Sequence, residues 1–407
     1  MSESVKQYVI VGNGVAGTMA AETLRKNDPS CRILLFADEP YPLYNRVGLP
    51  PMLKKKTPPE KVFMRSREKH EQLGIDLRLS TRVTAIHPEE KAVTDESGTA
   101  HRYDALLLAT GGRPYPLQVP GGDLQHIYNF QTFDDTRAIM DRIVESKNGL
   151  VTGGSYIAYE LAEGFHERGL HVTWLIRGSH FLRRVISQDG GALVDKIARG
   201  HGVEMVYGEE VAVVEGDSDG AVETVVTTGG KRFASDLVGV GLGLKTNTEL
   251  AEAAGIQVNK GIVTNEYLET SVPGIYAGGD VAEFFDVTIQ QHNIMGTWNN
   301  ASTHGRVAGA NMAGGRQVYR EVPTYTTTMF HTRMSVAGVT PESKKDLDSI
   351  SRVDMETDNF RQLFFWRNRL MGCVVIGDMK AKTEYTRLIQ AGAEFPEAAE
   401  RQRLLDL

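Results

Sequence analysis

The chain has 407 residues, of which 41% are apolar and 24% are charged, and this is the composition of an ordinary globular protein. Its length favours two or three domains over one core. A net charge of −7 without a long basic run argues against nucleic-acid binding, and no apolar stretch is long enough to span a bilayer. The N-terminal residues lack a signal-peptide pattern, and only Cys31 and Cys373 are cysteines, so we expect a cytoplasmic protein.

The first predicted unit is a strand, a glycine turn and a helix. QYVIV (7–11) is a short β-branched run, GNGVAG follows it, and TMAAETLRKN (18–27) continues as a helix. RILLF (32–36) is the next strand, and the helix between the two strands predicts that they run parallel.

GNGVAG has the spacing of a dinucleotide-binding turn. In such a turn Gly12 permits the tight bend, Gly14 lets the backbone approach a pyrophosphate, and Gly17 lets the helix pack on the strand. The helix N-terminus then offers N–H groups to the phosphates. Asp38 follows the second strand and is predicted to accept hydrogen bonds from ribose hydroxyls; the alternative is a solvated turn residue before Pro40.

The pattern returns at VTGGSYIAYE (151–160), where Gly153, Ser155 and Ala158 occupy the three glycine places. Alanine at the third place still permits helix packing. The side chain of Ser155 should face the incoming pyrophosphate, to which its hydroxyl can donate. HVTWLI (171–176) follows as a strand, so the chain is predicted to contain two similar nucleotide-binding folds.

Other segments extend this plan. YDALLLATGGRPYPL (103–117) holds a buried strand that ends in ATGG, and IYAGGD (275–280) repeats the strand-into-glycine pattern. Short alternating strands are predicted within residues 203–240. Farther on, FRQLFFWRNRLMGCVVIGD (360–378) is typical of antiparallel strands with a hairpin near Arg367–Asn368, which indicates a small α+β domain at the C-terminal end.

Taken in order, GNGVAG, ATGGRP (109–114), TGGSYIAYE and TSVPGIYAGGDVAEF (270–284) resemble the pyridine nucleotide–disulfide oxidoreductase superfamily over the whole chain. PYPLYNRVGL (40–49) and GTWNNASTHGRVAGANMAG (296–314) look like the branch that holds rubredoxin and ferredoxin reductases and the flavin module of NAD(P)H nitrite reductase. MGCVVIGD (371–378) resembles the C-terminal domain of that branch.

The resemblance implies an α/β fold class with two Rossmann-like nucleotide-binding domains and a small C-terminal α+β domain. An FAD-binding domain would be interrupted by an NAD(P)H-binding domain. The predicted boundaries are 1–116 and 243–321 for the FAD domain, 117–242 for the NAD(P)H domain, and 322–407 for the C-terminal domain.

The chain departs from the superfamily at its redox cysteines. It has no CxxxxC pair, and RVGLP (46–50) places Val47 where related peroxidases, oxidases and coenzyme A-disulfide reductases carry a thiol. A valine forms no thiolate, so a cysteine relay is not expected and electrons should leave the flavin directly. Pro51 and Thr326 stand where ferredoxin reductases of the branch carry a lysine and a tryptophan, which weakens that specific assignment.

The end of the second nucleotide strand bears on the choice of nucleotide. Ile176 stands where NADH-using relatives usually have an acid, and Arg177 and Arg183 match the arginine pair of NADPH-dependent glutathione reductase in type and spacing. Guanidinium groups suit a 2′-phosphate. We therefore favour NADPH, with NADH as the alternative, because arginine at the place of Arg177 also occurs in NADH users.

The resemblance also implies individual site residues. Asp280 would hydrogen-bond the ribityl chain of FAD, and Glu160 would lie close to the nicotinamide and flavin rings; the alternative for Glu160 is a surface residue. Arg46 is a second predicted catalytic residue and a flavin-side contact, and Trp298 either contacts the flavin or anchors the core. The remaining predicted cofactor contacts are Ala16, Val83, Ala109, Thr110, Gly111, Gly154, Tyr156, Ile157, Gly243 and Gly279; no metal site is predicted.

Together these features predict an FAD-dependent NAD(P)H oxidoreductase that passes a hydride from nicotinamide to flavin and electrons onward to a rubredoxin- or ferredoxin-like carrier protein. Two alternatives stay open. The acceptor could be a small molecule such as a quinone, monodehydroascorbate or oxygen, or the chain could be an electron-input subunit of a larger redox complex. A homodimer is compatible with either.

Overall fold

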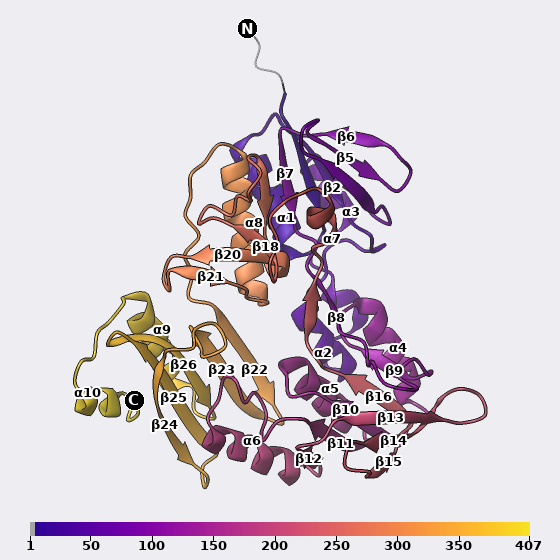
Figure 1. Ribbon diagram of the computed structural model, residues 1–407, viewed down its shortest axis with the longest axis vertical. Helices are drawn as coiled ribbons and strands as arrows, with labels where there is room; N and C mark the ends of the chain where they lie inside the picture. Colours follow the sequence, from indigo (N-terminus) through magenta and orange to yellow (C-terminus); the bar gives the residue numbers. More distant parts are fainter. Residues whose placement is uncertain (1–4) are drawn as a thin grey trace. The chain divides into compact units, whose positions relative to one another are not determined.

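The structure is a computed structural model that describes residues 5–407, and the chain divides into two units. Unit 1 comprises Met1–Val47, of which residues 5–47 are described, together with Pro58–Arg113 and Lys245–Glu321. Unit 2 comprises Gly48–Thr57, Pro114–Leu244 and Val322–Leu407. Figure 1 shows the helices and strands of both units.

Unit 1 is built on a five-stranded parallel sheet with the order β19-β7-β1-β2-β3. Its helices and strands are β1 (Gln7–Val11), α1 (Val15–Asn27), β2 (Arg32–Phe36), η1 (Arg46–Gly48), which runs into the next unit, η2 (Pro59–Val62), α3 (Arg67–Gln72), β3 (Ile75–Arg78), β4 (Val83–His87), β5 (Ala92–Asp95), β6 (Ala100–Arg102), β7 (Ala105–Leu108), α7 (Glu249–Ala253), β18 (Ile262–Thr264), β19 (Ile275–Ala277), η3 (Gly279–Val281), β20 (Ala282–Asp286), β21 (Gln291–Asn293) and α8 (Trp298–Met312). The chain passes between the units within β8 (Gly112–Pro114) and β17 (Leu244–Thr246).

Helices α1 and α8 pack closely in unit 1, where Figure 1 shows them side by side. Two glycines of α8 permit this approach. A Cβ at Gly305 would lie 2.2 Å from the carbonyl oxygen of Ala16, and one at Gly309 would lie 2.6 Å from that of Ala20. The GxxxG spacing in α8 therefore fixes how near this helix comes to α1, which begins at the first glycine turn.

Unit 2 repeats the parallel plan with the order β12-β11-β10-β16-β9. Its helices and strands are α2 (Leu49–Leu53), β9 (Ile127–Asn129), α4 (Phe133–Ile143), β10 (Asn148–Thr152), α5 (Tyr156–Glu167), β11 (His171–Ile176), α6 (Gln188–Gly200), β12 (Glu204–Tyr207), β13 (Val211–Gly216), β14 (Val222–Thr227), β15 (Arg232–Ala234), β16 (Leu237–Val240), β22 (Thr324–Met329), β23 (Thr332–Gly338), β24 (Asp348–Asp354), β25 (Asn359–Trp366), β26 (Arg369–Ile376), α9 (Lys380–Gln390) and α10 (Ala398–Leu404). The predicted fold class is confirmed: two doubly wound parallel sheets and a C-terminal α+β segment.

In both parallel sheets the order in which the chain adds strands reverses at an equivalent place. In unit 1 the chain runs from β1 outward to β2 and β3, and then returns to the other side of β1 as β7. In unit 2 it runs from β10 to β11 and β12 and returns beside β10 as β16. Ligands of open α/β sheets bind at such a switch point, outside the carboxyl ends of the strands. Both predicted glycine turns lie at these points.

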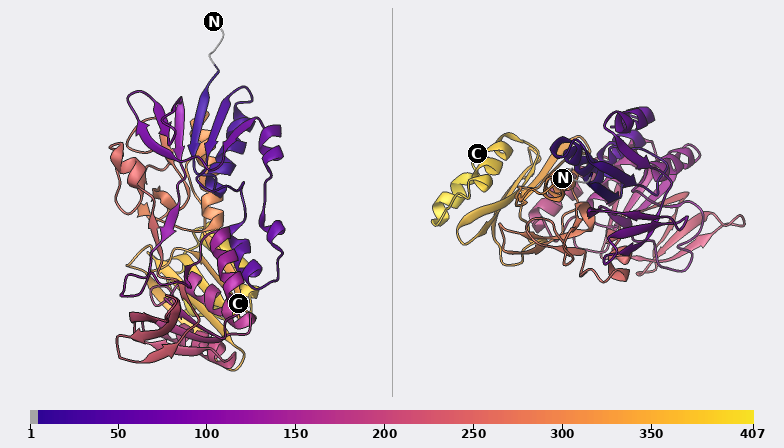
Figure 2. Two further views of the ribbon diagram at one scale, coloured as in Figure 1. Left: turned by 90° about the vertical axis from the view of Figure 1, so that its right-hand side faces the viewer. Right: turned by 90° about the horizontal axis from the view of Figure 1, so that it is seen from above.

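The C-terminal segment forms an antiparallel sheet with the order β22-β23-β26-β25-β24. The predicted hairpin is present: β25 and β26 are joined through Arg367 and Asn368, which both have positive φ, as a tight hairpin turn requires. Figure 2 shows α9 and α10, in yellow, on one face of this sheet. The segment lies in the same unit as residues 114–244, so its independence as a domain stays a prediction.

Alternation along β25 explains how this sheet is covered on both faces. Phe360 lies under Gly190 of α6, and the Gln362 side chain accepts a hydrogen bond of 2.9 Å from the backbone N–H of Ser187. Leu363 and Phe365 instead join the core under α9 and α10. Helix α6 therefore joins the C-terminal sheet to the nucleotide fold of unit 2.

Candidate functional site

The turn after β1 depends on glycine at two positions for steric reasons. Gly12 has a φ of +111°, and a Cβ there would lie 2.2 Å from the carbonyl oxygen of Ala109 at the end of β7. A Cβ at Gly17 would lie 1.9 Å from the carbonyl oxygen of Gly12. The sharp turn and the close seating of α1 at the switch point therefore exclude any larger residue at these two places.

Gly14 differs from both neighbours, because nothing lies within 4 Å of the place its Cβ would take. It is the N-cap of α1, and no side chain caps this helix end. Among the described residues no side chain therefore caps the first-turn N–H groups of α1, and the space at the Cβ position of Gly14 is open. This arrangement fits a pyrophosphate, which would accept from the N–H groups and interact favourably with the helix dipole.

Asp280 lies in η3, beyond the end of β19 in the same sheet. Among the described residues, no donor is within hydrogen-bonding distance of its carboxylate. The protein around it displaces water and raises its pKa to about 6, although Arg46 acts in the opposite direction. A carboxylate short of donors suits a ligand with hydroxyl groups, such as the ribityl chain that the family resemblance implies.

The backbone beside Asp280 is held by a residue that the sequence analysis missed. Gly279, with a φ of +78°, donates its N–H to Nδ1 of His304 over 3.2 Å. His304 is fully buried in α8, and this burial lowers its pKa to about 3, so the ring is uncharged at neutral pH. No local sequence signal identifies this role, because the two residues are 25 positions apart.

The predicted ribose ligand Asp38 and the predicted flavin contact Arg46 both lie in the segment after β2. Asp38 is largely exposed and pairs loosely with Arg82 at 3.5 Å. The adjacent Glu39 accepts from Arg46 and from the Tyr44 hydroxyl, each over 2.7 Å. Arg46 is thus held by an acid that the sequence analysis did not select, and Asp38 as a ribose ligand stays a prediction.

The remaining predicted residues of unit 1 lie on several different elements. Thr110 exchanges two hydrogen bonds of 2.8 Å with Asn247, which fixes the ATGG turn to the segment after β17. Val83 is buried in β4. Trp298 begins α8 and packs, partly buried, against the core, which agrees with its anchoring alternative. Contacts of these residues with a cofactor stay predictions.

Ser155 has a defined role in the second turn. It is the N-cap of α5, where its hydroxyl oxygen accepts from the N–H of Ala158 over 3.3 Å. The hydroxyl proton is donated to the carbonyl of Gly241 over 2.7 Å. The side chain therefore closes the helix end and joins it to β16, and in this arrangement its proton is not free for a pyrophosphate.

Alanine at the third glycine place is accommodated by a glycine on the neighbouring strand. A Cβ at Gly241, just after β16, would lie 2.6 to 2.7 Å from the N, Cα and Cβ atoms of Ala158. Gly153 resembles Gly12: its φ is +127°, and a Cβ there would lie 2.2 Å from the carbonyl oxygen of Gly241. The close packing at this switch point thus depends on Gly241, which the sequence analysis did not select.

Replacing Gly241 with alanine should therefore destabilise unit 2 by about 1–3 kcal/mol, the usual cost of forcing a methyl group into a packed site. Urea unfolding measures this cost. In the Gly241→Ala, Ala158→Gly double variant part of the loss should return, because one of the three close contacts disappears. A Gly241→Ala protein as stable as the wild type would contradict this account of the turn.

Glu160 lies on α5 one turn beyond Tyr156, and both face β22. The Tyr325 hydroxyl donates to the Glu160 carboxylate over 2.9 Å, and the rings of Tyr325 and Tyr156 lie 4.2 Å apart. Loss of water raises the pKa of Glu160 to about 7, although the Tyr325 hydrogen bond and nearby Lys54 lower it. Glu160 is thus partly buried and hydrogen-bonded to the protein, and its place beside a nicotinamide ring stays a prediction.

The two predicted arginines lie close together after β11. Arg177 is exposed and pairs with Glu210 at 3.2 Å. The side chain of Arg183 packs over Gly178: a Cβ added to Gly178 would lie 2.5 Å from the Cδ atom of Arg183. Among the described residues no carboxylate pairs with Arg183. The guanidinium group of Arg183 is therefore available to a phosphate. That of Arg177 is already paired with Glu210, an acid that the sequence did not single out.

Both cysteines lie in the core as free thiols. Burial raises the pKa of each, that of Cys373 to about 12, so neither is a reactive thiolate at neutral pH. Val47, at the place of the relatives' thiol, lies in η1 with about half of its surface exposed. The residues described by the structure thus offer no thiol beside this position.

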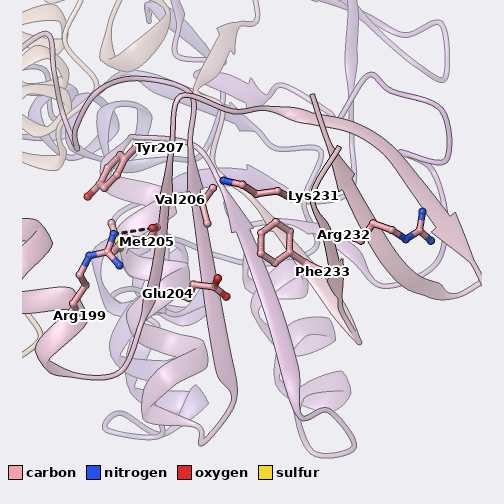
Figure 3. A pocket seen from close by; sticks show the side chains of 8 residues that line it. All are labelled: Arg199, Glu204, Met205, Val206, Tyr207, Lys231, Arg232 and Phe233. Atoms are coloured by element: carbon pink, nitrogen blue, oxygen red, sulfur yellow. Dashed lines mark hydrogen bonds between the residues drawn. The ribbon is translucent and has the colours of Figure 1, made fainter. Parts of the chain in front are cut away.

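A hollow of about 530 Å³ lies between β12 and β15 (Figure 3). It is lined by Arg199, Glu204, Met205, Val206, Tyr207, Lys231, Arg232 and Phe233. Its three basic groups pair with Asp195, Glu209 and Glu215. Since these cations are neutralised and no predicted site residue lines the hollow, the two switch points remain the candidate site.

Comparison with known proteins supports the predicted family and its C-terminal domain. Residues 6–305 match the model of the pyridine nucleotide-disulphide oxidoreductase family, and residues 332–393 match the rubredoxin NAD+ reductase C-terminal domain. Within the described residues 5–407, none of the helices combines the length and apolar character needed to cross a bilayer.

Similar curated proteins include putidaredoxin reductase CamA of Pseudomonas putida, which is 33% identical over 339 residues, covering 81% of this chain and 80% of the relative. Nitrite reductase [NAD(P)H] of Bacillus subtilis is 27% identical over 401 residues, covering 97% of this chain and 48% of the relative, so the chain spans about half of that protein.

Among solved structures, the covalent putidaredoxin reductase–putidaredoxin complex is similar with a TM-score of 0.90 and 28% identity, covering 95% of this chain and 93% of the matched chain. The prediction drawn from the four ordered motifs is thereby confirmed, and the C-terminal match agrees with the predicted branch. The chain belongs to the pyridine nucleotide-disulphide oxidoreductase family.

Proposed function

We propose that this protein is an FAD-dependent NAD(P)H oxidoreductase that passes electrons to a small protein carrier of the rubredoxin or ferredoxin class. The observation that carries the proposal is the pair of glycine turns at the two switch points, one in each parallel sheet. The similarity to a putidaredoxin reductase, whose structure is known in covalent complex with putidaredoxin, supports a protein acceptor.

The residues of unit 1 suit FAD. Gly14 and the uncapped N-terminus of α1 would hold its pyrophosphate, and Asp280 would accept from its ribityl hydroxyls. Arg46, oriented by Glu39, would supply a positive charge near Asp280. When bound, FAD accepts a hydride from a reduced nicotinamide and releases electrons to a further acceptor.

In unit 2 the N–H groups of Tyr156 and Ile157 would hold the nicotinamide nucleotide at the start of α5, since the Ser155 hydroxyl is committed to Gly241. Glu160 would lie beside the nicotinamide ring, and its carboxylate would accept from the carboxamide. No thiol takes part in the electron transfer, because both cysteines are buried. We also propose a cytoplasmic location, which suits cysteines that are free thiols.

Anaerobic stopped-flow reduction tests the proposal. We expect NADPH or NADH to bleach the flavin of the purified holoprotein, and an added ferredoxin or rubredoxin to accelerate its reoxidation. Failure of both nucleotides to bleach the flavin would reject the nicotinamide half of the proposal. Bleaching that no carrier protein helps to reverse would instead support a small-molecule acceptor.

A second candidate function is electron input into a larger redox assembly. It is favoured by one observation: the chain matches about half of a nitrite reductase along nearly its own full length. Co-purification of a subunit with an iron–sulfur centre, reduced by the nicotinamide nucleotide only in the assembly, would support this candidate over a free carrier.

For the nucleotide we propose NADPH over NADH, and Arg177→Ala tests the choice. Loss of a charge-assisted hydrogen bond to the 2′-phosphate should weaken NADP⁺ binding by about 10- to 100-fold, which corresponds to ~1.5–3 kcal/mol, and leave NAD⁺ binding nearly unchanged. Calorimetric titration measures both. Arg184→Ala is the matched control, since Arg184 is an exposed arginine beside Arg183 and should affect neither nucleotide. Equal losses for both nucleotides in Arg177→Ala would reject the assignment.

A further inference from the structure

Strand β22 of the C-terminal segment contacts α5 through Tyr325 and Thr327, two residues on the same face of the strand. Tyr325 donates to Glu160, and Thr327 hydrogen-bonds the hydroxyl of Tyr159, which also donates to the carbonyl of Thr328 over 3.3 Å. Thr326 and Thr328 point the other way and are exposed, as alternation along a strand requires. These hydrogen bonds therefore fix the position of β22 along α5.

Tyr325 touches two residues that lie on one face of α5. Its ring packs on Tyr156 at a centroid distance of 4.2 Å, and its hydroxyl reaches Glu160, four positions later. The same side chain therefore spans the first turn of the helix that starts at the second glycine turn. The donor comes from 165 residues away in the sequence.

We infer that Tyr325 is a positioning residue for Glu160: its hydroxyl orients the carboxylate and favours its ionised form at the nicotinamide site. The inference rests on the proposed function, in which Glu160 accepts from the nicotinamide carboxamide. Besides Tyr325, the groups that act on Glu160 are Lys54 at the end of α2, which favours the ionised form, and Glu163 on α5, which opposes it. Tyr159 has its hydroxyl on Thr327 and Thr328, and it also interacts with Tyr325 and with the charge of Glu160.

The sign of the effect follows from the hydrogen bond. A hydroxyl that donates to a carboxylate stabilises the charged form, so its removal raises the pKa of that carboxyl group. An ionised Glu160 attracts the positively charged ring of an oxidised nucleotide. Binding of NADP⁺ should therefore strengthen as the pH rises through the pKa of Glu160, which is about 7 in the intact protein.

Tyr325→Phe keeps the ring and removes only the donor. We expect the midpoint of the Glu160 titration to rise by about one pH unit, the size expected from one hydrogen bond to a charged group. Difference infrared spectra of the holoprotein, taken against Glu160→Gln, measure this midpoint through the carbonyl band of the protonated acid and require no nucleotide. The pH profile of NADP⁺ binding should move upward by the same amount.

Tyr385→Phe is the matched control, since it removes a buried phenol hydroxyl that donates to the carbonyl of Leu404 and has no part in the Glu160 site, and it should leave the midpoint in place. An unchanged or lowered midpoint in Tyr325→Phe, while Glu160→Gln abolishes the titration, would overturn the positioning role and leave the proposed function intact. If NADP⁺ binding in Glu160→Gln keeps the pH profile of the wild type, the proposed role of Glu160 fails as well, and the inference falls with it.

Discussion

Replacing Gly14 with valine is expected to weaken FAD binding at least about 100-fold without unfolding the apoprotein. Gly14 has a φ of −69° and a ψ of −175°, a conformation that valine adopts readily, and apart from its chain neighbours no residue has an atom within 4 Å of its Cβ position. The valine side chain would instead occupy the space in front of the uncapped α1 N-terminus. Loss of two charge-assisted hydrogen bonds there would cost about 3–6 kcal/mol, which lowers FAD affinity at least about 100-fold.

Flavin content after purification and titration of the apoprotein with FAD measure this loss, and circular dichroism with urea unfolding checks the fold. Gly17→Ala provides the contrasting variant. Its Cβ would lie 1.9 Å from the Gly12 carbonyl oxygen, so it should lower the stability of the apoprotein itself by about 1–3 kcal/mol or more. A Gly14→Val protein that retains FAD at wild-type affinity would refute the assignment of this turn.

Features that depend on short stretches of sequence were predictable. The parallel strands at 7–11 and 32–36, the second unit at 151–176 and the hairpin at Arg367–Asn368 all follow from β-branched runs, glycine spacing and turn residues. The pairing of two glycine turns with two switch points also follows, because the order of strands and helices in a βαβ unit fixes the side on which the chain returns.

Features that depend on distant partners were not predictable. The Ser155 hydroxyl could have faced a phosphate, and only its acceptor, the carbonyl of Gly241 on another strand, decides otherwise. Asn247, which holds Thr110, and Tyr325, which holds Glu160, are likewise 137 and 165 residues from their partners. A single sequence carries the chemistry of each side chain but not its neighbour in space.

Glu163 shows how much stability such a distant contact can carry. The carboxylate, on the buried side of α5, is 2% exposed and accepts from Lys54 over 2.5 Å and from the backbone N–H of Phe330 over 2.8 Å. It thereby joins three segments of unit 2: α5, the end of α2 and the β22–β23 turn. Phe330 has a φ of 43°, so the turn bends sharply where its N–H meets the acid.

We expect Glu163→Ala to lower the free energy of unfolding of unit 2 by about 3–5 kcal/mol, because the variant leaves the Lys54 ammonium and the Phe330 N–H buried without an acceptor. Urea unfolding measures the loss, and hydrogen exchange at the Phe330 amide should accelerate. The exposed neighbouring pair is the control: Lys56 and Glu167 are 3.1 Å apart with the lysine half exposed, and Lys56→Ala should cost at most about 1 kcal/mol.

A double variant separates the charge from the hydrogen bond. Lys54→Met alone leaves an unpaired carboxylate in the core, and Glu163→Gln alone leaves an unpaired ammonium, so each should be strongly destabilising. Combined, the two changes remove both charges, while the glutamine oxygen can still accept from Phe330 N–H. The double variant should therefore be more stable than the sum of the single losses allows. Additive losses would mean that Glu163 acts only through the Phe330 hydrogen bond and through packing, with no energetic coupling to Lys54.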